Sequence, residues 1–269
     1  MNFSFLGNSK SATKLSDYFM KSNINILGVY DISLQKAVEF ASYTDSKAFL
    51  SFDEAMIETD VIFVTDNKDL KTYINLIKSS SVTEKIIVII TSASPSDKIY
   101  TNERNTHFSL YSPALFSFEK KYMPDTEFIL EGFGIRYTEF IDYLKYKNLN
   151  TKTIPPNKAK EFYSIINLFT SGIETLIKIS QNQFKDYEID THKFTEQILY
   201  NSTIKDDPES AFFTTDTHSV INTIDTIKSL NNPALLSLYK IIGLNAIEYA
   251  PYNKDEKQHF KEIIMDNQK

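Results

Sequence analysis

In the first hundred residues, short apolar runs typical of strands alternate with segments whose apolar residues have helical spacing. This alternation constrains the fold more than any other feature. Short runs of mostly apolar residues, typical of strands, occupy positions 3–6, 24–31, 47–51, 60–66 and 85–93. Segments with helical spacing separate several of them, as in Leu15, Tyr18 and Phe19, and further helices are expected at 33–41 and 67–80. This order predicts a parallel sheet with crossover helices.

The pattern changes at Pro155-Pro156, a pair of residues that breaks regular structure. Before it, residues 106–154 contain further strand-like segments and one predicted helix at 136–147. After it, every periodic segment is helical, and helices are expected at 157–180, 188–202, 217–229, 233–249 and 254–266. We therefore predict an α/β fold, with a Rossmann-like doubly wound parallel sheet in a dinucleotide-binding domain (1–154) and an all-α domain (155–269).

Composition excludes several classes of function. The chain has 269 residues, 42% of them apolar, and a net charge of −6, which argues against a general nucleic-acid-binding protein. It contains no cysteine, and its four histidines lack metal-ligand spacing, so no metal site is expected. No apolar run approaches the ~20 residues of a membrane span, and no signal-peptide pattern is found. The expected location is cytoplasmic.

The first strand runs into a loop that is similar to the glycine-rich loop of dinucleotide-binding proteins. Its sequence, Gly7-Asn8-Ser9-Lys10-Ser11-Ala12, keeps the first glycine of G-x-G-x-x-G/A and an accepted alanine at the third position. Serine replaces the second glycine, and its hydroxyl is able to bind a phosphate that Lys10 also attracts. Gly7, Asn8, Ser9, Lys10 and Ser11 are therefore predicted to bind a cofactor, NADP or NAD, at the helix start. The alternative is an ordinary strand–turn–helix.

Asp31 ends the second predicted strand, 24 residues after Gly7. A carboxylate at this position accepts hydrogen bonds from the adenosine ribose and favours NAD, whereas Ser33 and Lys36 would accommodate the additional phosphate of NADP. The alternative is that Asp31 caps the next helix, and both roles can hold together. Ser33 is expected to be the N-cap of that helix.

Three polar residues close the next strands. Thr65 and Asp66 follow the fourth predicted strand, and Ser92 lies at the end of the fifth. Because the carboxyl ends of parallel strands line the ligand crevice, Thr65 and Asp66 are predicted cofactor contacts and Ser92 a catalytic candidate. A helix cap at Asp66 and a turn at Ser92 are the alternatives.

The order of several segments resembles the Rossmann-like family whose helical half is called DUF2520. The stretches that carry the likeness are FLGNSKSATKL, ILGVYDIS, DVIFVTDNKDL, IIVIITSAS, SLYSPALFSF, EFYSIINLFTSGI, AFFTTDTHSVINTI and LLSLYKIIGLNAIEYA. This group is related to the pyrroline-5-carboxylate reductases and to the helical domain of 6-phosphogluconate dehydrogenases. The chain is also similar to non-classical ketopantoate reductases.

The resemblance implies site residues in the second half of the chain. The family's His-Pro stands here as Ser112-Pro113 or, with a shift of one residue, as Tyr111-Ser112, and its Ser-Asn as Ser171-Gly172. The resemblance therefore implies that Ser112, Ser171 and Gly172 bind substrate. Tyr163 and Asp216 match a tyrosine and an aspartate of the family and are, with Ser92, the residues predicted to orient substrate or transfer a proton. Packing of Tyr163, a helix crossing at Gly172 and capping by Asp216 are the alternative interpretations.

The resulting hypothesis is an NAD(P)H-dependent reductase of a small 2-oxo acid, with ketopantoate in pantothenate biosynthesis as the first choice. Two other hypotheses are a non-catalytic dinucleotide-binding regulatory protein and an imine reductase of the pyrroline-5-carboxylate reductase type. The partners expected are a small-molecule substrate and a second copy of the chain in a homodimer, with neither nucleic acid nor membrane. The family's histidines are absent from the matching positions, so no mechanism is assigned to them.

Overall fold

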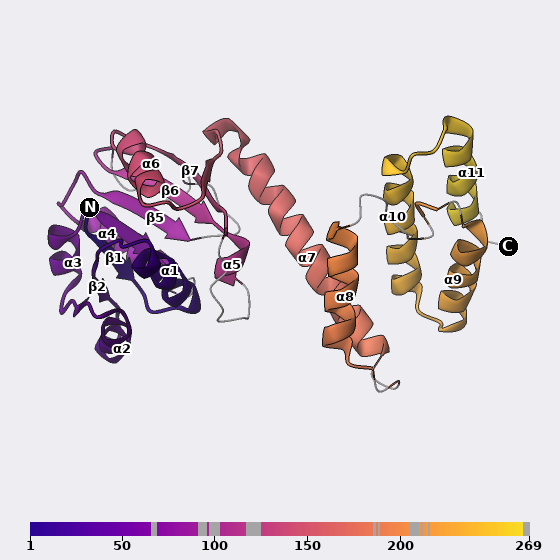
Figure 1. The fold of residues 1–269 in the computed structure, drawn as a ribbon, viewed down its shortest axis with the longest axis horizontal. Coiled ribbons are helices and arrows are strands. Elements are labelled where there is room, and N and C mark those ends of the chain that lie inside the picture. The colour runs from indigo at the N-terminus through magenta and orange to yellow at the C-terminus, as the bar shows by residue number, and fades with distance from the viewer. Residues whose placement is uncertain are drawn as a thin grey trace. The chain divides into compact units, whose positions relative to one another are not determined.

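A computed structural model describes residues 1–65, 69–90, 96, 103–116, 125–184, 187, 189–204, 210, 212–214 and 216–265. The chain divides into two compact units, Met1–Thr175 and Leu176–Lys269, which we describe one at a time (Figure 1).

The first unit alternates strands and helices as the sequence predicts. Its elements are β1 (Phe3–Leu6), α1 (Lys10–Lys21), β2 (Ile26–Tyr30), α2 (Leu34–Thr44), β3 (Lys47–Ala48), α3 (Phe52–Glu58), β4 (Val61–Val64), α4 (Leu70–Ser79), β5 (Ile86–Ile90), β6 (Thr106–Tyr111), α5 (Pro113–Phe116), β7 (Phe128–Phe133), α6 (Tyr137–Tyr146), β8 (Thr151–Thr153), the 3₁₀ turn η2 (Pro156–Lys158) and the first part of α7 (Ala159–Gln183).

These strands form one sheet of eight in the order β3-β2-β1-β4-β5-β6-β7-β8. Neighbouring strands from β3 to β6 are parallel, whereas β7 is antiparallel to β6, and β8 runs parallel to β7. The predicted α/β class with a mainly parallel sheet is thus confirmed, with two reversed strands at one edge. The chain moves outward from β1 in both directions, so a topological switch point lies between β1 and β4.

Both faces of the sheet are buried, which explains why its central strands are apolar throughout. Phe3, Phe5 and Phe63 pack on one face among residues of α1, α2 and α6. On the other face, residues such as Leu6, Ile62 and Ile89 pack against α3 and α4. The sheet therefore forms a rigid platform for the loops at its ends.

The sequence analysis missed α3, which has a clear start signal. The backbone N–H of Glu54 donates to Ser51 Oγ, and the Glu54 carboxylate accepts from the backbone N–H of Leu50. Ser51-Phe52-Asp53-Glu54 is thus a capping motif of the S-x-x-E kind, readable in the sequence before the structure is known.

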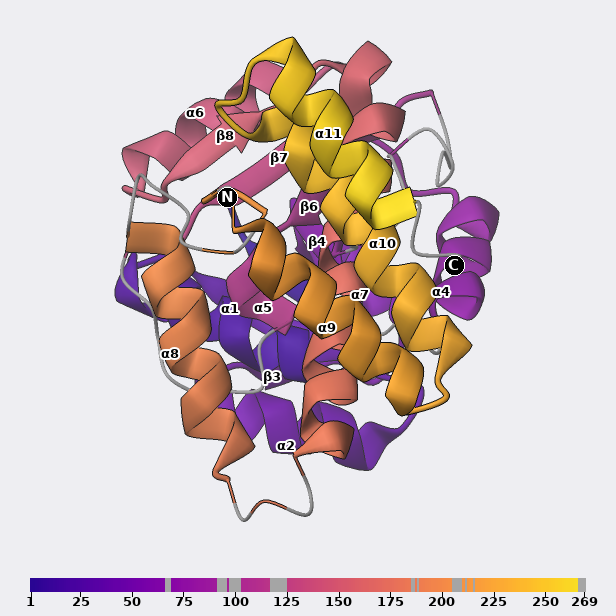
Figure 2. The same ribbon diagram turned by 90° about the vertical axis from the view of Figure 1, so that its right-hand side faces the viewer.

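The second unit is helical, as predicted. It contains the end of α7 followed by α8 (Thr191–Ile204), α9 (Thr217–Ser229), α10 (Pro233–Tyr249) and α11 (Lys254–Met265). The last three helices lie side by side (Figure 2) around a core that includes Phe212, Ile224, Ile247 and Phe260. In the part of the chain that the structure describes, no helix is both long and apolar enough to cross a bilayer.

The sheet ends at Thr153 of β8, and Pro155 precedes η2; the domain boundary expected at residues 154/155 stays a prediction. The compact units divide later, between Thr175 and Leu176, within α7. The reason is that the first turns of α7 belong to the sheet unit: Ala159 and Tyr163 pack on Tyr111 of β6.

Candidate functional site

The loop between β1 and α1 has the backbone geometry of a tight strand-to-helix turn. Gly7 has φ 92°, a region that residues with a side chain rarely adopt, and its N–H donates to the carbonyl of Tyr30 at 2.9 Å. Ser9 is the N-cap of α1, and its Oγ accepts a hydrogen bond from the N–H of Ala12 at 3.2 Å. The first predicted glycine is therefore needed by the conformation of the backbone.

Three consecutive backbone N–H groups at this turn, those of Ser9, Lys10 and Ser11, have no acceptor within the described residues. They lie at the N-terminus of α1, where the helix dipole adds a partial positive charge. Groups so placed bind phosphate oxygens. Ser9 Oγ is occupied as an acceptor by Ala12, but its O–H remains able to donate.

Asp31 holds this loop from the end of β2. Its Oδ2 accepts from the N–H of Asn8 and its Oδ1 from the N–H of Ser33, both at 2.8 Å, and the residue is 6% exposed. Ser33, as predicted, is the N-cap of α2, so Asp31 does not occupy that position. Each carboxylate oxygen can accept a second hydrogen bond, which leaves Asp31 able to bind a ribose hydroxyl.

Asn8 adds a second link between the loop and α2, because its side-chain amide donates to the carbonyl of Lys36 at 3.0 Å. Thr65, which follows β4, is buried beneath the loop. Its hydroxyl donates to the carbonyl of Gly7 at 2.6 Å. Thr65 thus fixes the loop from below. The other two predicted residues at strand ends, Asp66 and Ser92, lie outside the described residues.

The short helix α5 is attached to the first turns of α1. Lys14 Nζ donates to the carbonyl of Ala114 at 3.2 Å, and Ser11 Oγ contacts the carbonyl of Leu115 at 3.5 Å. Ser112, immediately before α5, is fully buried, and its hydroxyl has no hydrogen-bond partner in the described structure. Ser112 therefore lies on the same side of the sheet unit as the loop, at the carboxyl end of β6.

Tyr163 occupies a different environment from the loop. It is 2% exposed and packs with Tyr111 and Ala159, and its hydroxyl shares a hydrogen bond with the side chain of Ser109. Burial is the main cause that raises the pKa of Tyr163, and the charge of Glu131 adds to the effect. The phenol is therefore neutral at physiological pH and faces the sheet.

The remaining predicted site residues are not joined to the loop by any contact that the structure describes. Ser171 and Gly172 are exposed on α7, and a Cβ added at Gly172 would meet nothing within 4 Å, so no close helix crossing requires this glycine. Asp216 belongs to the second unit and is the N-cap of α9. Its carboxylate accepts from the N–H and the hydroxyl of Ser219, and these bonds lower its pKa.

Two buried polar residues were missed by the sequence analysis. Glu131, in the middle of β7, accepts two hydrogen bonds from Ser96, which lies between β5 and β6. A signal was present, because Glu131 is the one charged residue within the strand Phe-Ile-Leu-Glu-Gly-Phe. A charge inside a buried strand needs a specific partner.

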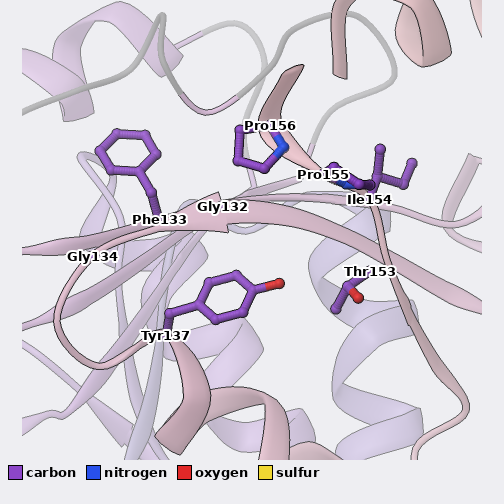
Figure 3. A pocket seen from close by; sticks show the side chains of 8 residues that line it. All are labelled: Gly132, Phe133, Gly134, Tyr137, Thr153, Ile154, Pro155 and Pro156. Carbon is purple, nitrogen blue, oxygen red and sulfur yellow. The ribbon is translucent and has the colours of Figure 1, made fainter. Parts of the chain in front are cut away.

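A cavity of about 460 Å³ lies at the other end of the sheet (Figure 3). Phe133, Tyr137, Thr153 and Pro155 are among the residues that line it, and the Tyr137 hydroxyl points toward Thr153. Phe133 pairs with His107 near the start of β6, which places the cavity beside the amino ends of the parallel strands. It is therefore not part of the crevice at the glycine loop. Among the described residues, no group of acidic or histidine side chains is arranged to hold a metal ion.

A scan against protein-family models and a search of curated proteins found no match to this chain. Solved structures are similar to it. A candidate NADP oxidoreductase from Bacteroides fragilis shares 14% identity with a TM-score of 0.67, over 91% of this chain and 97% of that one. An imine reductase from Pseudomonas sp. shares 13% identity with a TM-score of 0.58, over 97% of this chain and 91% of the other.

A pyrroline carboxylate reductase from Plasmodium falciparum, solved with NADP bound, shares 14% identity with a TM-score of 0.57, over 98% of both chains. The chain has the fold of NAD(P)-dependent oxidoreductases. The likeness extends over the parallel sheet and the helical region that follows it. Membership of the DUF2520 family stays a prediction, because no family model matches.

Proposed function

We propose that this protein is an NAD(P)H-dependent reductase of a small carbonyl or imine compound. One observation carries the proposal: the three N–H groups of Ser9, Lys10 and Ser11 have no acceptor within the described residues and lie beside Asp31, in a fold shared with NAD(P)-dependent oxidoreductases. These N–H groups would hold the pyrophosphate, and Asp31 the adenosine ribose. The bound coenzyme supplies a hydride; the chain binds and orients the reactants.

Asp31 favours NADH over NADPH in this proposal. Its carboxylate accepts hydrogen bonds from both Asn8 and Ser33, so it is held as an acceptor at the position of the ribose hydroxyls. A 2′-phosphate there would face a negative charge, and within 31–38 only Lys36 would offset it. The pyrroline carboxylate reductase to which the chain is similar was solved with NADP, so both coenzymes need to be measured.

For the substrate we propose a 2-oxo acid, with ketopantoate as the first compound to test. Support comes from the sequence resemblance to non-classical ketopantoate reductases. Ser112, at the carboxyl end of β6, is fully buried and its hydroxyl has no partner in the described structure, so its contact with substrate stays a prediction. The roles predicted for Tyr163, Ser92, Asp216, Ser171 and Gly172 stay predictions.

Reduction of a C=N bond is the second candidate, and the comparisons favour it. An imine reductase and a pyrroline carboxylate reductase have the fold of this chain over nearly its whole length. Both candidates use the same coenzyme loop, so they differ only in the compound that accepts the hydride.

Oxidation of NADH and of NADPH by the purified protein, with ketopantoate or pyrroline-5-carboxylate, tests these proposals. Oxidation that depends on ketopantoate supports the first candidate, and oxidation that depends on pyrroline-5-carboxylate supports the second. Coenzyme binding without turnover of either compound would favour the non-catalytic regulatory protein. A protein that binds neither NADH nor NADPH would contradict the proposed function as a whole.

We further propose that the chain forms a homodimer through α7. Ile165, Leu168 and Phe169 are 58%, 77% and 64% exposed on this helix. Contiguous large apolar side chains on a surface mark an interaction site, since their exposure to water is unfavourable. A second copy of the same helix is the partner of matching apolar character.

A further inference from the structure

The edge of β7 that faces β8 is covered along only part of its length. Phe128–Leu130 of β7 pair with Thr151–Thr153 of β8, and the N–H of Ile154 adds a last bond to the carbonyl of Leu130 at 2.9 Å. β7 itself continues to Phe133. Among the described residues, its backbone beyond Leu130 therefore has no neighbouring strand on this side.

Gly132 is the residue of this stretch whose backbone groups point to the uncovered edge. The N–H and carbonyl groups of a strand alternate between its two edges from one residue to the next. Phe128 and Leu130 both bond to the β8 side, so Gly132, two residues further on, points the same way. Gly132 is buried, yet its N–H and carbonyl have no hydrogen-bond partner within the described residues. Buried backbone groups are rarely left unpaired, so this donor and acceptor mark a place for a ligand.

Pro156 explains why β8 does not continue along this edge. The carbonyl of Leu130 accepts from residue 154, so in a continued parallel ladder the carbonyl of Gly132 would accept from residue 156. Residue 156 is a proline, which has no N–H, and the chain turns into η2 at this point. The chain's own strand therefore ends where Gly132 needs a donor.

The cavity near the amino ends of the parallel strands lies against these two backbone groups (Figure 3). Gly132 lines it, and its volume of about 460 Å³ is within the range of small-ligand sites. Phe133 and Pro156 lie on one side of β7, and Tyr137 and Thr153 lie on the other. The cavity thus has a wall on either side of the donor and acceptor.

Both aromatic walls are held by a second ring. Phe133 stacks on His107 with ring centroids 5.5 Å apart, and Tyr137 stacks on Phe108 with centroids 5.2 Å apart. His107 and Phe108 are fully buried in β6. Walls that are fixed before binding lose little conformational entropy when a ligand enters.

An extended peptide matches this arrangement of groups. One residue of an antiparallel strand exchanges both of its backbone hydrogen bonds with the residue opposite it, as Gly132 requires. A side chain at Gly132 would point to the Tyr137 side of the sheet, so the residue paired with it places its side chain there, beside Thr153. Side chains alternate along an extended chain, so its two neighbours place theirs beside Phe133 and Pro156.

The charge of the cavity lining decides the kind of peptide. None of the eight residues that line it is charged. A free tripeptide would bring a charged amino group and a carboxylate next to Gly132, and burying a charge without a partner is costly. An interior segment of a protein brings neither. We propose that the edge of β7 binds an extended, uncharged segment of a partner protein by β-strand addition, at a place separate from the coenzyme loop.

Capped and uncapped peptides test this ligand chemistry on the full chain. The probe is the tripeptide acetyl-Ala-Val-Ala-amide, and NMR titration of the isotope-labelled protein follows the backbone amide signal of Gly132. The same peptide with an N-methylated valine lacks the N–H that would donate to the Gly132 carbonyl. Uncapped Ala-Val-Ala carries both charged termini. Thr153→Arg fills the cavity with a long charged side chain, and Lys152→Arg, on the same strand but outside the lining, is its control.

The capped peptide is expected to shift the Gly132 signal and to bind with a Kd of about 1 mM, because only three residues contribute. N-methylation, removal of the caps and Thr153→Arg should each weaken binding by about tenfold or more. Lys152→Arg should leave the affinity unchanged. Since the modified peptides are tested on the wild type, the result does not depend on the folding of a variant.

Equal binding of the N-methylated peptide, or no binding of the capped peptide at about 10 mM, would overturn the inference. Tighter binding of the uncapped peptide would show that the ligand is a free peptide and that a partner segment is wrong. The mass in solution is measured for the wild type and for Thr153→Arg. A dimer that Thr153→Arg alone converts into a monomer would show that a second copy of the chain occupies the edge, which also contradicts the proposed partner.

Discussion

The N–H of Asn8 donates a hydrogen bond to Asp31 Oδ2 at 2.8 Å, and this bond joins the loop after β1 to the end of β2. The other oxygen of the same carboxylate accepts from the N–H of Ser33. Asp31 therefore stabilises the loop directly. In the proposed function the same carboxylate would also accept a hydrogen bond from the ribose of a dinucleotide.

Replacing Asp31 with asparagine should weaken NADH binding by about tenfold, because one charge-assisted bond to the backbone is lost. NADPH binding should fall less, since the repulsion of its 2′-phosphate is removed at the same time. Fluorescence titration with each coenzyme measures both effects. Asp53→Asn, at an exposed acid of α3, is the control and should change neither. Equal losses for the two coenzymes would argue against ribose recognition by Asp31.

Gly7→Ala should destabilise the protein by about 1–2 kcal/mol, because alanine is strained at φ 92°. The matched control is Gly172→Ala. This glycine lies in α7 with open space around its Cβ position, so alanine should stabilise the protein by about 0.5–1 kcal/mol. Urea unfolding measures both changes. The substrate affinity of Gly172→Ala tests the substrate contact predicted for this residue.

Stability should fall as the pH is lowered from 6.5 toward 4, through His107. Burial lowers the pKa of this histidine from 6.5 to about 4. Between these values the unfolded chain binds the proton and the folded chain does not, so acid favours unfolding. The loss attributable to His107 between pH 7 and pH 5 is about 2 kcal/mol. Urea unfolding of the wild type and of His107→Gln is measured at both pH values. Since glutamine does not titrate, the difference between the two proteins in their loss of stability gives the part due to His107.

Leu168→Asp should convert the proposed dimer into a monomer. Leu168 is 77% exposed on α7, and a charge there would have to be buried without a partner in an apolar interface. Light scattering coupled to size-exclusion chromatography reports the mass. Lys160→Glu, an exposed substitution in the first turns of the same helix, is the control and should leave the mass unchanged. A wild-type protein that is monomeric at micromolar concentration would contradict the proposal.

Local patterns predicted most of the fold. The alternation in residues 1–100 predicted the parallel sheet, and the spacing after Pro155 predicted the helices. Such patterns can be read from the sequence because the spacing of apolar residues along a helix or strand depends on whether one or both of its faces are buried. The helix α3 was missed although Ser51 and Glu54 form its capping motif.

The candidate site was predicted less completely. The sequence by itself determined the elements, the need for Gly7 at a strand-to-helix turn and the place of Asp31 at the end of a strand. Only the tertiary structure decided what these residues contact. Three hydrogen bonds join residues that are 23 to 58 positions apart: Asn8 to Asp31, Thr65 to Gly7 and Ser96 to Glu131. Such partners depend on strand order and register, which are set by the packing of the whole sheet and leave no period in the sequence.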